Sequence, residues 1–136
     1  MEKPIVNIAD VPLLDRGNGE QFVAKWGRTG PLLGLTGLGC AVHVVPPGKK
    51  AFPFHRHHVA DELFFIVSGE GQYRFGEETF PLRAGDIVGA PAGSKAHQII
   101  NTGPEELRYL GISTIGGVDI VDYPDSGNVA TPTAEY

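Results

Sequence analysis

Histidine is the residue type in this sequence whose positions most directly indicate chemistry. Four of the five histidines lie in two short segments, with His55, His57 and His58 in the first and His97 in the second. A carboxylate, Glu62, follows the first group closely. Imidazole nitrogens and carboxylate oxygens are ligands that borderline divalent ions such as Fe, Mn, Ni and Zn accept. These residue types therefore predict a site for one divalent metal ion.

The spacing of these residues indicates which of them can converge. In extended chain successive side chains alternate between faces, so His55 and His57 point the same way, about 7 Å apart, and His58 points oppositely. Glu62 opens an apolar segment and is expected at a strand end beside the histidine pair. His97 begins a later strand and could supply a third imidazole from across a barrel.

Two neighbouring residues compete for places at this site. A bulge in the loop would exchange the orientations of His57 and His58, and Asp61 competes with Glu62 in the same way. Both alternatives stay open at the level of sequence. The remaining histidine, His43, stands apart and is predicted to be structural.

The apolar segment after Glu62 suggests a lining for a pocket. If Glu62 faces inward, Phe64 and Ile66 do too, because they share its parity. Together with Ile99 they would give a pocket an apolar floor, although a role as barrel core fits them equally well. Gln98 lies near the site in sequence, where it could bind an anionic group or meet solvent.

The elements that must position these residues are short strands. The chain has 19 Gly and 11 Pro among 136 residues, while 41% of its residues are hydrophobic. This combination favours many short strands joined by tight turns. Without a convincing amphipathic helix, the pattern predicts an all-β sandwich or barrel. The expected strands are 41–45, 62–67, 72–75, 79–82, 86–90, 97–101 and 107–115.

One domain accounts for the whole chain, in three parts. Residues 1–39 form an arm, broken by many Gly and Pro, that is expected to pack on the barrel or on a partner subunit. Within it, 21–26 suits either a short strand or one helical turn. Residues 40–115 form the barrel. Residues 116–136 form a C-terminal extension whose turn at 123–127 would fold over an edge of the barrel.

Composition excludes several classes of function. The formal charge is -5 with no basic block, so nucleic acid is not an expected partner. No apolar run approaches the roughly 20 residues of a membrane helix, and the first residues do not resemble a signal peptide, so we expect the cytosol and no membrane. The single cysteine, Cys40, excludes an internal disulfide.

Two segments carry a family resemblance. The segment from Gly48 through the histidine pair and Glu62 to Gly69 resembles the first cupin motif, G(x)5HxH(x)3-4E(x)6G. The segment from Gly85 through His97 to Asn101 resembles the second, G(x)5PxG(x)2H(x)3N. One loop in each segment is a residue longer than the pattern, and loops tolerate such insertions. The resemblance covers roughly residues 40–115.

The resemblance implies the cupin double-stranded β-helix, a jelly-roll barrel, in the form of the small single-domain cupins of bacteria. It also implies that His55, His57, Glu62 and His97 hold the metal and leave two adjacent positions open. The chain would then be a small metalloenzyme of dioxygenase or isomerase type acting on a small organic substrate. The alternative is a non-catalytic module that binds or senses a small molecule. A homodimer is expected, with Phe65 and Val67 on its apolar outer face.

Overall fold

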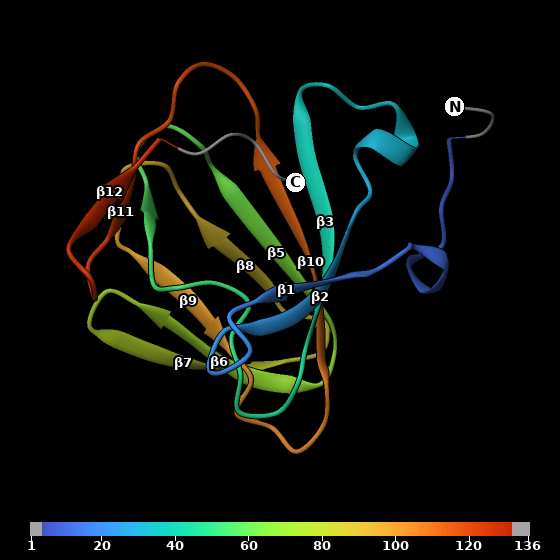
Figure 1. Cartoon of the computed structure of the whole chain (residues 1–136), viewed down its shortest axis with the longest axis horizontal. Coiled ribbons are helices and arrows are strands. Elements are labelled where there is room, and N and C mark those ends of the chain that lie inside the picture. Colours follow the sequence, from blue (N-terminus) through green and yellow to red (C-terminus); the bar gives the residue numbers. More distant parts are fainter. Residues whose placement is uncertain (1–3, 132–136) are drawn as a thin grey trace.

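The computed structural model describes residues 4–131 and is built almost entirely of antiparallel strands (Figure 1). Two short 3-10 turns, η1 (Ile8–Asp10) and η2 (Pro31–Leu33), lie in the N-terminal segment. The strands are β1 (Leu14–Gly17), β2 (Val23–Arg28), β3 (Leu38–Val45), β4 (Arg56–His57), β5 (Glu62–Ser68), β6 (Glu70–Phe75), β7 (Glu78–Arg83), β8 (Ile87–Ala90), β9 (His97–Ile100), β10 (Leu107–Thr114), β11 (Val121–Tyr123) and β12 (Asn128–Ala130). The all-β prediction is confirmed.

The strands form three sheets. The largest has six strands in the order β1-β2-β3-β10-β5-β8, and the two smaller sheets have the orders β7-β6-β9 and β12-β11-β4. Figure 1 shows β3, β10 and β5 side by side, with β6, β7 and β9 grouped together at another side of the molecule. Consecutive strands often lie in different sheets, as in a jelly-roll barrel.

Alternation along β5 and β10 builds the core. In β5 the side chains of Glu62, Phe64 and Ile66 are buried, whereas Leu63 and Phe65 are partly exposed. This is the inward parity that the sequence predicts. The main cluster of buried apolar residues also includes Val45, Leu82, Val88, Ile99, Leu107 and Tyr109.

The predicted strands between residues 40 and 115 are all present, with ends that differ by a few residues. The largest differences are at β3, which begins at Leu38, and at β6, which begins at Glu70. Gly69 turns the chain between β5 and β6 with φ at 87°, and an added Cβ there would lie 2.5 Å from the carbonyl oxygen of Glu106. Only glycine fits this turn without strain.

The N-terminal arm is more regular than its Gly and Pro content indicates. Residues 23–28 form a strand rather than a helical turn, and β2 pairs with both β1 and β3, with Trp26 opposite His43. The edge of β3 offers backbone hydrogen-bond partners to β2, and the sequence pattern of residues 23–28 alone does not show that these partners are nearby. The arm therefore extends the six-stranded sheet of its own chain.

The C-terminal segment folds over the barrel beside β4. Strand β11 pairs with β12 and with β4, and the turn between β11 and β12 is tied to β6 by Arg74. The Arg74 guanidinium lies over the ring of Phe54 at 3.7 Å and donates hydrogen bonds to both carboxylate oxygens of Asp125, at 2.8 and 3.1 Å. Residues 1–3 of the arm and 132–136 of the extension lie outside the described part of the chain.

Among residues 4–131, no helix has the length and apolar character that crossing a bilayer would require.

Candidate metal centre

Glu62 is the centre of a cluster of histidines. It is the first residue of β5, and its side chain is fully buried. Its Oε1 lies 3.0 Å from Nε2 of His57, 3.0 Å from Nε2 of His97 and 3.5 Å from Nε2 of His55. Three imidazoles therefore present the same ring nitrogen to one carboxylate oxygen.

Local strand pairing brings the three histidines together. The backbones of His55 and His97 exchange two hydrogen bonds of 3.1 and 2.8 Å, which places their rings 4.5 Å apart. His57 follows in β4, on the same side as His55, with a ring separation of 5.1 Å. The predicted shared face of His55 and His57 is thus present in the structure.

Hydrogen bonds at the remote nitrogens set the tautomers of two histidines. His55 Nδ1 lies 2.8 Å from the carbonyl oxygen of Pro53, and His57 Nδ1 lies 2.7 Å from Oδ2 of Asp119. Because both partners only accept, each Nδ1 carries a proton and donates it. In the neutral rings, Nε2 then has a lone pair directed at Glu62.

This donor set fits a divalent cation. Lone pairs of His55 and His57 facing the Glu62 carboxylate repel one another unless positive charge lies among them. The three ligand atoms of His55, His57 and Glu62 lie within 4.8 Å of one another, close enough to bind one ion. A carboxylate behind a ligating histidine, as Asp119 lies behind His57, is a common support of metal sites.

The pKa shifts in the cluster also indicate a place for positive charge. Burial would raise the pKa of Glu62, but the contacts with His55, His57 and His97, whose Nε2 atoms donate to Glu62 when the rings are protonated, outweigh it and hold that pKa well below its usual range. Burial would lower the pKa of His57, but its bonds to the carboxylates of Glu62 and Asp119 raise it. Burial lowers the pKa of His97. The cluster thus holds an ionised carboxylate and attracts positive charge.

The two competing residues lie elsewhere. Nε2 of His58 is 2.8 Å from Oδ2 of Asp122 on β11, and the side chain is about one third exposed. Asp61 accepts a hydrogen bond of 2.7 Å from the backbone N–H of Ala92. His57 and Glu62 therefore lie in the cluster, and His58 and Asp61 have other partners.

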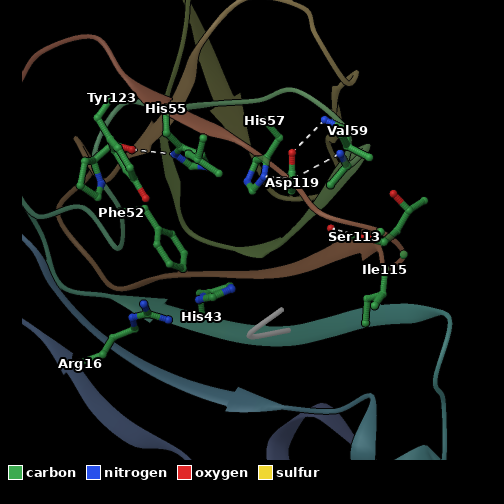
Figure 2. A pocket seen from close by; sticks show the side chains of 16 residues that line it. Arg16, His43, Phe52, His55, His57, Val59, Ser113, Ile115, Asp119 and Tyr123 are labelled. Carbon is green, nitrogen blue, oxygen red and sulfur yellow. Dashed lines mark hydrogen bonds and ion pairs between the residues drawn. The ribbon is translucent and has the colours of Figure 1, made fainter. Parts of the chain in front are cut away.

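A cavity of about 270 Å³ opens beside the cluster (Figure 2). His55, His57 and Asp119 border it on one side, and His43 on β3 and Arg16 on β1 border it on the other. The remaining lining residues are Phe52, Pro53, Val59, Ala60, Ser113, Thr114, Ile115, Gly116, Gly117, Val121 and Tyr123.

The residues that the sequence suggested for a pocket lie in the interior instead. Phe64, Ile66 and Ile99 belong to the main apolar core, and Phe64 packs against the ring of His97 at 5.8 Å. Gln98 is buried, and its Nε2 donates a hydrogen bond of 3.1 Å to the carbonyl oxygen of Phe52. None of these four residues is among those that line the cavity.

Several cavity residues were not found by sequence reasoning. Arg16, Asp119 and Tyr123 come from the two segments outside the predicted barrel, and no local pattern marks them. His43 was predicted to be structural. It is fully buried, stacks on Tyr109 at 5.0 Å and also borders the cavity. Burial and then the charge of Arg16 lower the pKa of His43 to about 3, which keeps its imidazole neutral.

Comparison with known proteins identifies the family. The model of the cupin domain matches residues 41–113, which is more than half of the chain. The chain therefore belongs to the cupin family, as the two sequence motifs indicated.

Individual relatives extend the likeness to specific proteins. The chain is 32% identical over 68 residues to the "Oxalate-binding protein" of Thermotoga maritima, covering 50% of this chain and 54% of that one. It is 30% identical over 133 residues to "Auxin-binding protein 1" of Arabidopsis thaliana, covering 90% and 65%. The crystal structure of a "Putative sugar phosphate isomerase" of Acidithiobacillus ferrooxidans superposes with a TM-score of 0.82 at 28% identity, covering 90% and 85%. The chain thus spans about half to two thirds of the two curated relatives.

Proposed function

We propose that this cupin is a small metalloenzyme that uses one divalent ion to bind and transform a small organic substrate. The observation that carries the proposal is the convergence of three imidazole Nε2 atoms on Oε1 of Glu62 beside a cavity. His55, His57, Glu62 and His97 would hold the ion. A divalent ion with four protein ligands accepts further ligands and acts as a Lewis acid toward a bound oxygen.

The protein's own residues have separate tasks in this scheme. His55 and His57 present Nε2 because Pro53 and Asp119 hold their Nδ1 protons. Ser113 and Ile115 border the cavity (Figure 2). Val121 also belongs to its lining. The side chain of Glu62 is fully buried, so its negative charge would balance the charge of the ion in a place that water does not reach.

The relatives support a small-molecule substrate. Their names refer to oxalate, auxin and a sugar phosphate, which are all small organic compounds. A keto, enol or hydroxy acid has two oxygens that can bind one ion together, and isomerase or dioxygenase chemistry would follow from the charge that the ion stabilises. We propose the cytosol as the compartment, which cell fractionation tests.

Metal content tests the ligand assignment. Wild-type protein purified without chelator is expected to carry about one equivalent of Fe, Mn, Ni or Zn by elemental analysis, and His57→Ala and His97→Ala below roughly a tenth of that. His58→Ala is the matched control, because His58 bonds Asp122 instead of Glu62. Full metal content in His57→Ala and His97→Ala would show that the assignment is wrong.

The alternative, a non-catalytic binding module with the metal as anchor, rests on the relatives named for binding oxalate and auxin. A turnover screen separates the two. Diketones, phenols and sugar-type acids are offered to the metal-loaded protein with and without oxygen. Turnover of one compound supports the enzyme. Tight binding of one compound without any turnover supports the module.

A further inference from the structure

Ser113 is a buried hydroxyl at the wall of the cavity. It lies near the end of β10, where it is the direct partner of Glu62 in the pairing with β5. Both residues are 4% exposed. Directly opposite side chains in an antiparallel pair lie on the same face, with Cβ atoms about 5 Å apart. Because Ser113 also borders the cavity, its hydroxyl lies between the proposed metal centre and the space for a ligand (Figure 2).

The hydrogen bonding of Ser113 decides what it offers to a ligand. Its Oγ donates to the backbone carbonyl oxygen of Thr114 at 3.0 Å. A serine hydroxyl has one proton and two lone pairs, so a hydroxyl whose proton is already used acts toward a ligand as an acceptor. A hydroxyl group of a ligand can donate to it, whereas a methyl group cannot and would leave this buried oxygen with an unfilled acceptor.

The other polar side chains near Ser113 already have partners. Each carboxylate oxygen of Asp119 accepts two hydrogen bonds, and Oδ2 receives one of them from His57. Oγ1 of Thr114 accepts a hydrogen bond of 3.0 Å from the backbone N–H of Asp61. The lining residues that are close to these in the chain have no polar side chain, namely Val59, Ala60, Ile115, Gly116 and Gly117. A ligand hydroxyl at this end of the cavity therefore finds its acceptor in Ser113.

The cavity sets the size of the ligand that could use this acceptor. Its volume of about 270 Å³ corresponds to roughly nine water molecules in the liquid, which suits an acid with a short carbon chain. Such an acid would place two adjacent oxygens on the ion. Because Ser113 is opposite Glu62, a hydroxyl on the next carbon is the group of the ligand that we expect to meet Ser113.

We propose that Ser113 is a specificity-determining residue, and that the ligand is a short 2,3-dihydroxy or 3-hydroxy-2-oxo acid whose 3-hydroxyl donates a hydrogen bond to Ser113 Oγ. The proposal deepens the proposed function and rests on it. A site that pairs with a hydroxyl of its ligand discriminates against the analogue without this hydroxyl, because the analogue leaves a buried polar group unpaired.

Isothermal titration of metal-loaded protein with paired acids tests the role of Ser113. The pairs are glycerate with lactate, each as both enantiomers, and 3-hydroxypyruvate with pyruvate. The two members of a pair offer the same two oxygens to the ion and differ only in the 3-hydroxyl. Wild type is expected to bind at least one hydroxylated acid about five- to tenfold more tightly than its partner, as one added hydrogen bond would give.

Three variants show whether this preference comes from Ser113. Ser113→Ala removes the acceptor, so the two members of the pair are expected to bind within about twofold of each other. Ser113→Cys has a side chain of similar shape whose sulfur is a weak acceptor, so it should lose most of the preference, and it gives the answer if Ser113→Ala does not fold. Ser68→Ala is the matched control and should keep the preference of wild type, because Ser68 is exposed at the opposite end of the β5–β10 pair and does not border the cavity.

Elemental analysis of the same samples separates this inference from the function on which it rests. Equal binding of the paired acids by metal-loaded wild type, or no binding of any of these acids, would overturn the role of Ser113 and leave the metal centre standing. An unchanged preference in Ser113→Ala with full metal content would do the same. A wild type that does not take up a divalent ion would overturn both proposals.

Discussion

At the residue scale, the proposed metal centre depends on hydrogen bonds that lie behind the proposed ligands. Asp119 holds the Nδ1 proton of His57 and also accepts the backbone N–H of Val59 at 2.9 Å. Although burial would raise the pKa of Asp119, its hydrogen bonds with His57, Val59 and Ile120 lower it, so it stays ionised. One carboxylate thus fixes the tautomer of a proposed ligand and the loop that carries it.

Asp119→Asn is expected to weaken metal binding by 10- to 100-fold, because an amide neither pairs with the imidazole nor increases its basicity as a carboxylate does. Competitive titration with a metallochromic chelator measures the change. Asp122→Asn is the matched control, since Asp122 pairs with His58 and Arg56, away from the cluster. Equal loss of affinity in the two variants would contradict the assignment.

At the element scale, β11 positions Asp119 and Tyr123, and β11 itself is held at both ends. Its backbone pairs with β4, and the turn that follows it is tied to β6 through Arg74 and Asp125. Hydrogen bonding to Asp125 raises the pKa of Arg74. Both side chains are substantially exposed, so their ion pair fixes position more than it adds stability.

Arg74→Lys removes the bidentate hydrogen bonds to Asp125 and the contact with Phe54. Because this site is exposed, we expect the free energy of unfolding to fall by no more than about 1 kcal/mol. Hydrogen exchange at residues 121–130 is nevertheless expected to accelerate clearly. Mass spectrometry of exchanged peptides measures this. Unchanged exchange there, with Arg83→Lys as the surface control, would show that the contact does not hold the turn.

At the scale of the whole molecule, a buried ion that bridges β5, β9 and the loop before β4 should stabilise the barrel. Saturation at about one hundred times the dissociation constant adds about 2.7 kcal/mol, or on the order of 10 °C in melting temperature for a chain of this size. Scanning calorimetry before and after dialysis against a chelator measures the shift. The shift should vanish in Glu62→Gln, and a shift of equal size there would place the ion elsewhere.

The outer face of the six-stranded sheet favours the homodimer that the sequence suggested. Phe65 on β5 pairs with Ile87 on the edge strand β8, and these side chains are 38% and 70% exposed. We expect light scattering to give twice the mass of one chain, and Phe65→Asp with Ile87→Lys to give a monomer. A monomeric wild type at micromolar concentration would contradict this expectation, and Leu14→Asp on β1 is the control.

The sequence predicted those features of the site that depend on residues close together in the chain. The alternation along β5 predicted that Phe64 and Ile66 share the face of Glu62, and the two-residue spacing predicted the shared side of His55 and His57. Sequence reasoning failed where partners are distant. Asp119 is 62 positions from His57, and Arg16 reaches the cavity only because β2 pairs with the edge of β3. No periodicity within either segment encodes such a contact.

The segments that surround the cavity differ in their origin along the chain. His55, His57, Glu62 and His97 all lie within the matched domain at 41–113, whereas Arg16, Asp119 and Tyr123 lie outside it. Mutations at Arg16 or Tyr123 would therefore change the cavity without replacing a proposed metal ligand, whereas mutations at Asp119 would also affect His57. In evolutionary terms, the proposed metal ligands are inherited with the barrel, and the residues that shape the rest of the cavity can diverge with the terminal extensions.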